Sequence, residues 1–219
     1  MFAWPTVCGD RPAVMGIVNV TPDSFSDGGD VGSVEAAVAR ASAMQAADIL
    51  DIGGESTRPG AAEVAADAEI ARTAPVIGAI RAKSAVPISI DTRKSDVGLA
   101  ALSAGATMIN DVAAFTFDPM LADVAAKAGV PVCVMHAQGT PETMQDDPNY
   151  DDVLLDVYDF LLARIDAAVG AGIQRDQIVV DPGIGFGKTV AHNLTLLRGI
   201  ALFHSLGCPI LLGASRKRF

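Results

Sequence analysis

Polar residues able to bind or activate a ligand follow each of seven short apolar runs in the sequence. These residues are Asn19, Asp51, Asp91 with Thr92, Asn110 with Asp111, His136, Asp181, and Ser215 with Lys217. One Asp after a strand is explained equally well as a helix cap or a turn residue. The repetition after every run favours a shared site at the rim where the carboxyl ends of parallel strands meet.

The residue types in this set indicate the chemistry of the ligand. Asp91, Asn110 and Asp181 offer acceptors, or a mixture of donors and acceptors, to the edge of a flat heterocycle that carries N–H and NH₂ groups. Arg58 and Lys217 are the cations best placed for an anion, and an arginine can bind a phosphate through two N–H groups. We therefore expect a ligand that combines a polar ring with an anionic group.

Other catalytic motifs are weak or missing from the sequence. The segment PGIGFGKT resembles a phosphate-binding loop, but Pro182 stands where such a loop needs its first glycine. Neither G-x-S-x-G nor H-E-x-x-H occurs. His136 ends an apolar run, which leaves open a role in the site or in a structural hydrogen bond. His192 and His204 fall on a predicted helix away from the rim, and we expect them at the surface.

The elements that position these residues alternate regularly along the chain. The apolar runs are mostly continuous, which is typical of strands buried on both faces of a parallel sheet. The predicted strands are 14–20, 47–52, 86–90, 107–109, 130–135, 177–180 and 209–212, and the predicted helices are 33–46, 62–82, 94–103, 119–127, 150–170 and 193–205. This pattern favours a (β/α)₈ TIM barrel over an open doubly wound sheet, with about seven βα units present. We predict one domain over residues 1–219.

Composition excludes several classes of partner. A net charge of −10 argues against nucleic acid, because binding to phosphate backbones needs a basic surface. No apolar run approaches the ~20 residues of a membrane span, and no signal peptide is visible at the start. Cys8, Cys133 and Cys208 form no C-x-x-C pair, which predicts neither a disulfide nor a zinc site. We expect a cytoplasmic protein with small-molecule substrates.

Seven segments, read together, resemble the dihydropteroate synthase family of pterin-binding enzymes. They are MGIVNVTPDSFSDGG, DIGGESTRPGA, ISIDTRK, MINDV, VCVMHAQGTPETMQ, VVDPGIGFGK and LLGASRKRF, in family order across essentially the whole chain. The resemblance implies a (β/α)₈ barrel that joins 6-hydroxymethyl-7,8-dihydropterin diphosphate to 4-aminobenzoate. The products would be 7,8-dihydropteroate and diphosphate, in the step of folate synthesis that sulfonamides target.

The resemblance also implies roles for individual residues. The pterin pocket would be formed by Asp91, Asn110, Asp181 and Lys217, and Asn19 would help to hold the diphosphate and Mg²⁺. The 4-aminobenzoate pocket would be lined by Phe25, Thr57, Arg58, Pro59, Phe186 and Ser215. Catalysis would come from Mg²⁺, Arg58 and Lys217 stabilising the leaving diphosphate, with Asp91 helping to spread positive charge on the pterin methylene. We expect a dissociative step in which the amine enters second.

Two alternatives remain at this point. A corrinoid-dependent methyltetrahydrofolate methyltransferase shares the pterin-binding barrel, but it would not need the segments STRPG and SRKRF. The chain could also bind a pterin without turnover. Family members continue through an eighth strand that carries an Arg-x-His pair, so we expect a truncated chain with little activity. The resemblance implies a homodimer for the full-length form.

Overall fold

Six parallel strands form one sheet in the computed structural model, which describes residues 10–21, 34–56, 61–139, 143–144, 146–215 and 217. The strands lie side by side in chain order: β1 (Met15–Asn19), β2 (Ile49–Gly53), β3 (Ile88–Asp91), β4 (Met108–Asp111), β5 (Val132–Met135) and β6 (Ile178–Asp181). Every neighbouring pair is parallel. The predicted fold class, a TIM barrel present in part, is confirmed.

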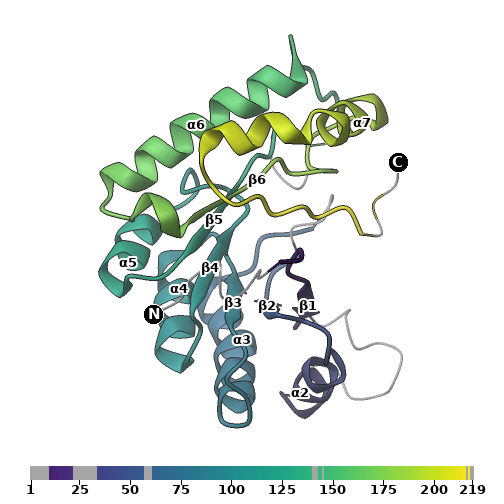
Figure 1. The fold of residues 1–219 in the computed structure, drawn as a ribbon. Helices are drawn as coiled ribbons and strands as arrows, with labels where there is room; N and C mark the ends of the chain where they lie inside the picture. The colour runs from purple at the N-terminus through teal and green to yellow at the C-terminus, as the bar shows by residue number, and fades with distance from the viewer. Residues whose placement is uncertain are drawn as a thin grey trace.

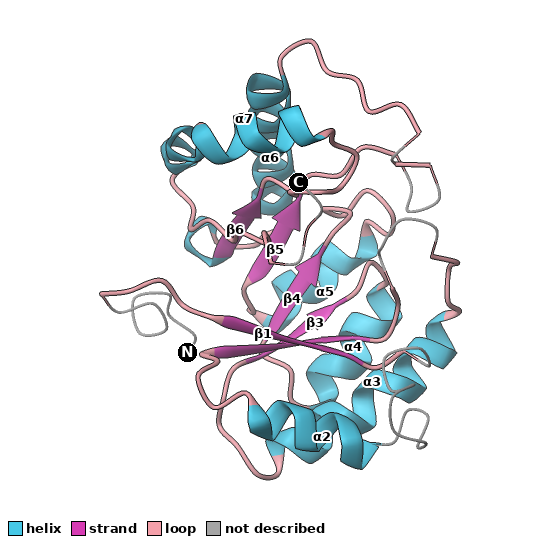
Figure 2. Cartoon of the chain, turned by 90° about the vertical axis from the view of Figure 1, so that its right-hand side faces the viewer, coloured by secondary structure: helices cyan, strands magenta, loops and turns pink. Residues whose placement is uncertain are grey.

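Helices connect successive strands and form an arc around one face of the curved sheet (Figure 1). They are α2 (Val34–Ala43), α3 (Ala66–Arg81), α4 (Ser95–Ala104), α5 (Met120–Ala128), α6 (Val153–Gly170) and α7 (Val190–Arg198), with short 3₁₀ segments η2 (Arg175–Gln177) and η3 (Ile200–Leu206). Figure 2 shows the other face of the strands free of these helices. No helix in the described part of the chain is long and apolar enough to cross a membrane.

The two faces of the sheet carry different side chains, because neighbouring residues of a strand point to opposite faces. The large hydrophobic core lies between strands and helices and takes in Val18, Ile52, Ile90, Ile109 and Val180. The opposite, inner face has only a small buried cluster, formed by Met108, Cys133 and Val179. In each strand the residue after the one that packs against the helices therefore projects toward this inner face.

The seventh predicted strand, 209–212, is only partly formed. Ile210 makes a single parallel bridge to Val180. Val180 N donates to Pro209 O at 3.0 Å and Leu211 N donates to Val180 O at 2.9 Å. The apolar pattern correctly placed this segment beside β6, but the pairing does not continue beyond these two bonds.

The helix predicted over 193–205 starts three residues too late and is not continuous, although helical turns do extend to Leu206 in η3. α7 begins at Val190, because the Thr189 side chain accepts a hydrogen bond from His192 N and His192 Nδ1 accepts one from Thr189 N, which together make a capping box. It ends before Gly199, where a Cβ atom would lie 2.6 Å from Leu154 of α6. The close approach of two helices therefore separates α7 from η3.

Candidate active site

The carboxyl ends of β1 to β4 bring four residues into one row. Asn19 pairs in register with Gly53, Gly53 with Asp91, and Asp91 with Asn110. Strand alternation turns this row toward the inner face, because Val18, Ile52, Ile90 and Ile109 pack under the helices. The predicted convergence of Asn19, Asp91 and Asn110 on one rim is observed.

Gly53 allows the row to close around a shared space. A Cβ atom at this position would lie 3.4 Å from Asn19 Oδ1 and 3.5 Å from Asp91 Oδ2. Both oxygens thus approach the same point from neighbouring strands. Only a residue without a side chain leaves that space available to a ligand.

A buried carboxyl of β2, two residues before Gly53, contacts one residue of this row. Asp51 is 3% exposed, and its Oδ2 accepts a hydrogen bond of 3.2 Å from Asn110 Nδ2. Burial raises the pKa of Asp51, and hydrogen bonding from its neighbours acts in the opposite direction. The sequence placed Asp51 at a strand end but did not predict that it contacts Asn110.

Asp91 lies in a strongly acidic environment. Its pKa is well above the usual carboxyl range, first because of burial and then because of the charges of Asp51, Glu69, Asp111 and Glu55. Its Oδ1 is buried without a hydrogen-bond partner among the described residues. Such a carboxyl is suited to receive a ligand N–H donor, which would satisfy the oxygen and offset the surrounding charge.

Asp181 is oriented by the loop that follows β6. Gly183 N donates to Asp181 Oδ1 at 2.7 Å, and Oδ2 lies on the side of Gly213, 3.9 Å from the place of a Cβ there. Burial raises the pKa of Asp181 to about 6, against the opposing effects of that backbone bond and of Lys188 and Lys217. Gly183 has φ +68°, and a Cβ there would lie 1.8 Å from His136 O, so only glycine fits.

Lys188 fastens this loop to the end of β5, a role that the sequence did not reveal. Its Nζ lies 2.8 Å from His136 Nδ1 and donates to Phe186 O at 2.9 Å and to His136 O at 3.3 Å. Burial and the nearby charge of Lys188 lower the pKa of His136 to about 3. His136, whose role was left open above, therefore makes a structural contact as a neutral ring.

Tyr150 extends this support to the far side of the loop. Its hydroxyl donates to Gly187 O at 2.6 Å, and its ring meets that of His192 edge-on with 5.0 Å between centroids. His192 is half-buried by this contact, so the expected surface position was wrong for it, whereas His204 is exposed as predicted.

Lys217 lies over the same loop on the side of the site. Its Nζ is 4.0 Å from the centroid of the Phe186 ring, and its stem packs where a Cβ of Gly185 would lie, with 2.9 Å to Cδ. Ser215 is exposed nearby in the chain. The structure thus brings Lys217, Phe186 and Asp181 together, while Phe25, Thr57, Arg58 and Pro59 lie outside the described residues.

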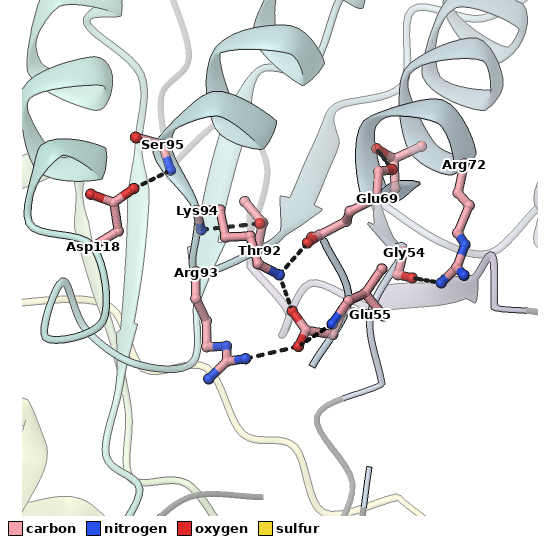
Figure 3. Close-up of polar contacts among 11 residues, drawn as sticks. Gly54, Glu55, Glu69, Arg72, Thr92, Arg93, Lys94, Ser95 and Asp118 are labelled. Carbon is pink, nitrogen blue, oxygen red and sulfur yellow. Dashed lines mark hydrogen bonds and ion pairs between the residues drawn. The ribbon is translucent and has the colours of Figure 1, made fainter. Parts of the chain in front are cut away.

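A buried network of charged residues holds the ends of β2 and β3 together (Figure 3). Lys94 Nζ forms ion pairs with Glu55 and, at 2.7 Å, with Glu69 of α3, and Arg93 pairs with Glu55 at 2.8 Å. Burial opposes the charge of Lys94, but the hydrogen bonds that it donates to the two glutamates, with their charges, outweigh burial and raise its pKa. These two cations stand two and three residues after Asp91 in the chain, yet they pair with buried acids.

Arg93 also borders an apolar cavity at the rim. Its guanidinium lies 4.2 Å from the centroid of the Phe117 ring, and the cavity continues past Met135, Phe160 and Phe186. The rim therefore offers acceptors on strand ends beside an apolar wall with aromatic rings. Together, fold and site define a barrel enzyme that binds a polar heterocycle.

Comparisons with known proteins name that class. A family described as "Pterin binding enzyme" matches residues 15–219. The dihydropteroate synthase of Escherichia coli strain K12 is 48% identical over 209 residues, which cover 94% of this chain and 74% of that protein. The chain belongs to the pterin-binding enzyme family and, within it, to the dihydropteroate synthases, which are transferases of folate biosynthesis.

Solved structures of the same family are also similar in fold. The Xanthomonas albilineans dihydropteroate synthase with 4-aminobenzoic acid has a TM-score of 0.89 and 52% identity, covering 95% of this chain and 75% of that one. The Yersinia pestis dihydropteroate synthase with a sulfonamide drug has a TM-score of 0.90 and 46% identity, covering 94% and 76%.

Proposed function

We propose that this chain joins 6-hydroxymethyl-7,8-dihydropterin diphosphate to 4-aminobenzoate and that Asp91, Asn110 and Asp181 bind the pterin edge. One observation carries the assignment of residues: acceptors from β3, β4 and β6 face one inner rim, and two of the carboxyls have raised pKa values. The ring N–H and NH₂ groups would satisfy these buried acceptors. Lys217, beside Asp181 and above Phe186, would bind the ring carbonyl and N5.

The reaction breaks the C–O bond between the pterin methylene and the diphosphate and forms a C–N bond to the amine, which loses one proton. A neutral arylamine needs no strong base. His136 is bonded to Lys188 rather than directed at the rim, which is consistent with a reaction limited by loss of the leaving group. Lys217 and Arg58 would stabilise the diphosphate, and Asp91 the cationic pterin methylene.

A Mg²⁺ ion fits the residues at the end of β1. Within the described residues no three His, Cys, Asp or Glu side chains form a metal-binding group. Mg²⁺ in phosphate-transfer sites commonly uses one or two protein oxygens plus the substrate phosphates, and Asn19 Oδ1, which borders the space above Gly53, could supply one. When bound, the ion would offset charge on the diphosphate. We further propose, from the family resemblance, a single domain, the 4-aminobenzoate pocket given above and a homodimer.

Binding and turnover test this proposal separately. Calorimetry with 7,8-dihydropteroate should show binding that weakens at least about tenfold in Asp181→Asn, because one of the two buried acceptor oxygens is replaced by an NH₂ donor. Asp123→Asn, on the exposed side of α5, is the matched control and should bind like the parent chain. A folded chain that binds no dihydropteroate would overturn the assignment.

Turnover distinguishes synthesis from pterin binding alone or methyl transfer. Diphosphate release and incorporation of labelled 4-aminobenzoate should occur together, slowly, and only with the pterin diphosphate. If diphosphate is released when 4-aminobenzoate is omitted, the dissociative order is supported. A release that is fully blocked without the amine contradicts that order.

A further inference from the structure

The orientation of the Asn110 amide is determined by a residue below it. Asn110 Nδ2 donates to Asp51 Oδ2 at 3.2 Å, and an ionised carboxylate can only accept hydrogen bonds. The amide therefore turns its NH₂ group down toward Asp51 and its Oδ1 away from it. An asparagine, in principle a donor or an acceptor, becomes an acceptor on the side opposite Asp51.

The contact between Asp51 and Asn110 lies inside the barrel, beneath the rim. Asp51 lies on β2 and Asn110 on β4, so the bond passes across β3, whose Ser89 pairs in register with both Asp51 and Met108. Asp51 is 3% exposed, whereas Asn110 is half-buried at the rim. Asp51 therefore acts from beneath the site and does not itself form the rim.

Without this contact the amide could turn over freely. Rotation by half a turn about the last side-chain bond exchanges O and NH₂ in nearly the same volume. With Asp51 ionised, that rotation would place two oxygens against each other and lose a charge-assisted bond.

We propose that Asp51 is a positioning residue that makes the site selective for rings presenting NH₂ or N–H to Asn110, and so for 2-amino pterins over 2-oxo lumazines. This inference rests on the proposed pterin site. A lumazine carries a carbonyl oxygen where a pterin carries its amino group. Placed against Asn110 Oδ1, that oxygen would leave two acceptors facing each other.

The test compares two ring probes, 6-hydroxymethylpterin and 6-hydroxymethyllumazine, by calorimetry at one mildly alkaline pH. The parent chain should prefer the pterin by at least about tenfold. In Asp51→Leu the amide is free to turn, and the ratio of the two affinities should fall to within about twofold. Asp51→Asn keeps an acceptor and the side-chain shape, so its ratio of pterin to lumazine affinity should be intermediate. This variant replaces Asp51→Leu in the test if Asp51→Leu does not fold.

Cys133→Ala is the matched control, because Cys133 pairs in register with Asn110 on the inner face without a hydrogen bond to its amide. It should change both affinities alike and keep their ratio, as a purely structural effect would. A ratio unchanged in Asp51→Leu and Asp51→Asn, with pterin still preferred, overturns this inference alone. If the parent chain binds neither ring, the proposed pterin site fails as well.

Discussion

Two buried lysines flank the site, and they are held in opposite ways. Lys94, on the side of β2 and β3, is 7% exposed and pairs with two glutamates (Figure 3), which raise its pKa. Lys188, on the side of β5 and β6, is 3% exposed and contacts a neutral histidine and two carbonyl oxygens. Burial is the largest factor that lowers the pKa of Lys188 to about 7, and the charge of Asp181 only partly opposes it.

Burial lowers the pKa of both lysines, and the partners decide whether that effect is outweighed, as it is at Lys94 but not at Lys188. On the Lys94 side the charge is needed, since among the described residues Glu69 pairs with Lys94 alone and Glu55 would be left with Arg93 only. On the Lys188 side the amine can donate hydrogen bonds to the carbonyl oxygens whether or not it is protonated. The contacts that hold the loop after β6 therefore do not require a charged lysine. Both clusters support the site without lying on its inner face.

The largest expected effect comes from removing the cation that has acidic partners. Lys94→Met leaves the buried Glu69 without a cation and Glu55 with Arg93 alone, and it should lower the free energy of unfolding by about 3–5 kcal/mol, measured by urea denaturation. Lys83→Met, at an exposed lysine, is the control and should stay within about 0.5 kcal/mol. The double variant Glu69→Gln, Lys94→Met, which keeps the Glu55–Arg93 pair, should recover most of the loss. A Lys94→Met chain as stable as the control would contradict this account of the network.

A smaller effect, visible as a pH dependence, is expected at Lys188. Its pKa is about 7 in the folded chain and near 10.5 when unfolded, so between these values the unfolded chain binds more protons. Stability should therefore rise with pH in this window, by up to about 1.4 kcal/mol per pH unit from this group. Below pH 7 both forms are protonated and the contribution is constant.

Denaturation of Lys188→Met across pH 7 to 9 isolates that contribution as the difference in slope from the parent chain. The exposed Lys127→Met is the control and should follow the parent slope. Equal slopes in Lys188→Met and the parent chain would mean that Lys188 keeps its proton throughout, as Lys94 does.

The smallest effect concerns one neutral hydrogen bond of the Lys188 side. Tyr150→Phe removes the 2.6 Å bond to Gly187 O and should lower stability by about 1 kcal/mol, since the buried carbonyl loses its donor. Tyr158→Phe, which loses only an exposed contact of 3.0 Å with Ser205, should change stability by less than about 0.5 kcal/mol. Equal effects of the two changes would show that the loop does not depend on Tyr150.

Local sequence signals predicted much of the fold. Continuous apolar runs predicted β1 to β6, and the helix predicted over 150–170 ends where α6 ends, at Gly170. At the start of α5, Asp118 Oδ1 accepts a hydrogen bond from Met120 N at 3.0 Å, a local contact typical of an Asp just before a helix. These signals act over a few residues, so they can be read without knowing the fold.

The partners of the charged residues could not be predicted in this way. Nothing local distinguishes Arg93 and Lys94, which pair with Glu55, from cations that would bind a phosphate. The role of Lys188 depends equally on His136, which is 52 residues distant in the chain. Such contacts form only when separate βα units close side by side.

The sequence by itself determined the alternation of strands and helices, the family, and the kinds of polar group that end each strand. The reason is that strand alternation and the rim of a parallel sheet follow from local pattern. Only the tertiary structure decided which cations pair with buried acids and which way the Asn110 amide points. Asp51 and Asn110 are 59 residues apart, and their contact exists because the curled sheet brings β2 and β4 within reach across β3.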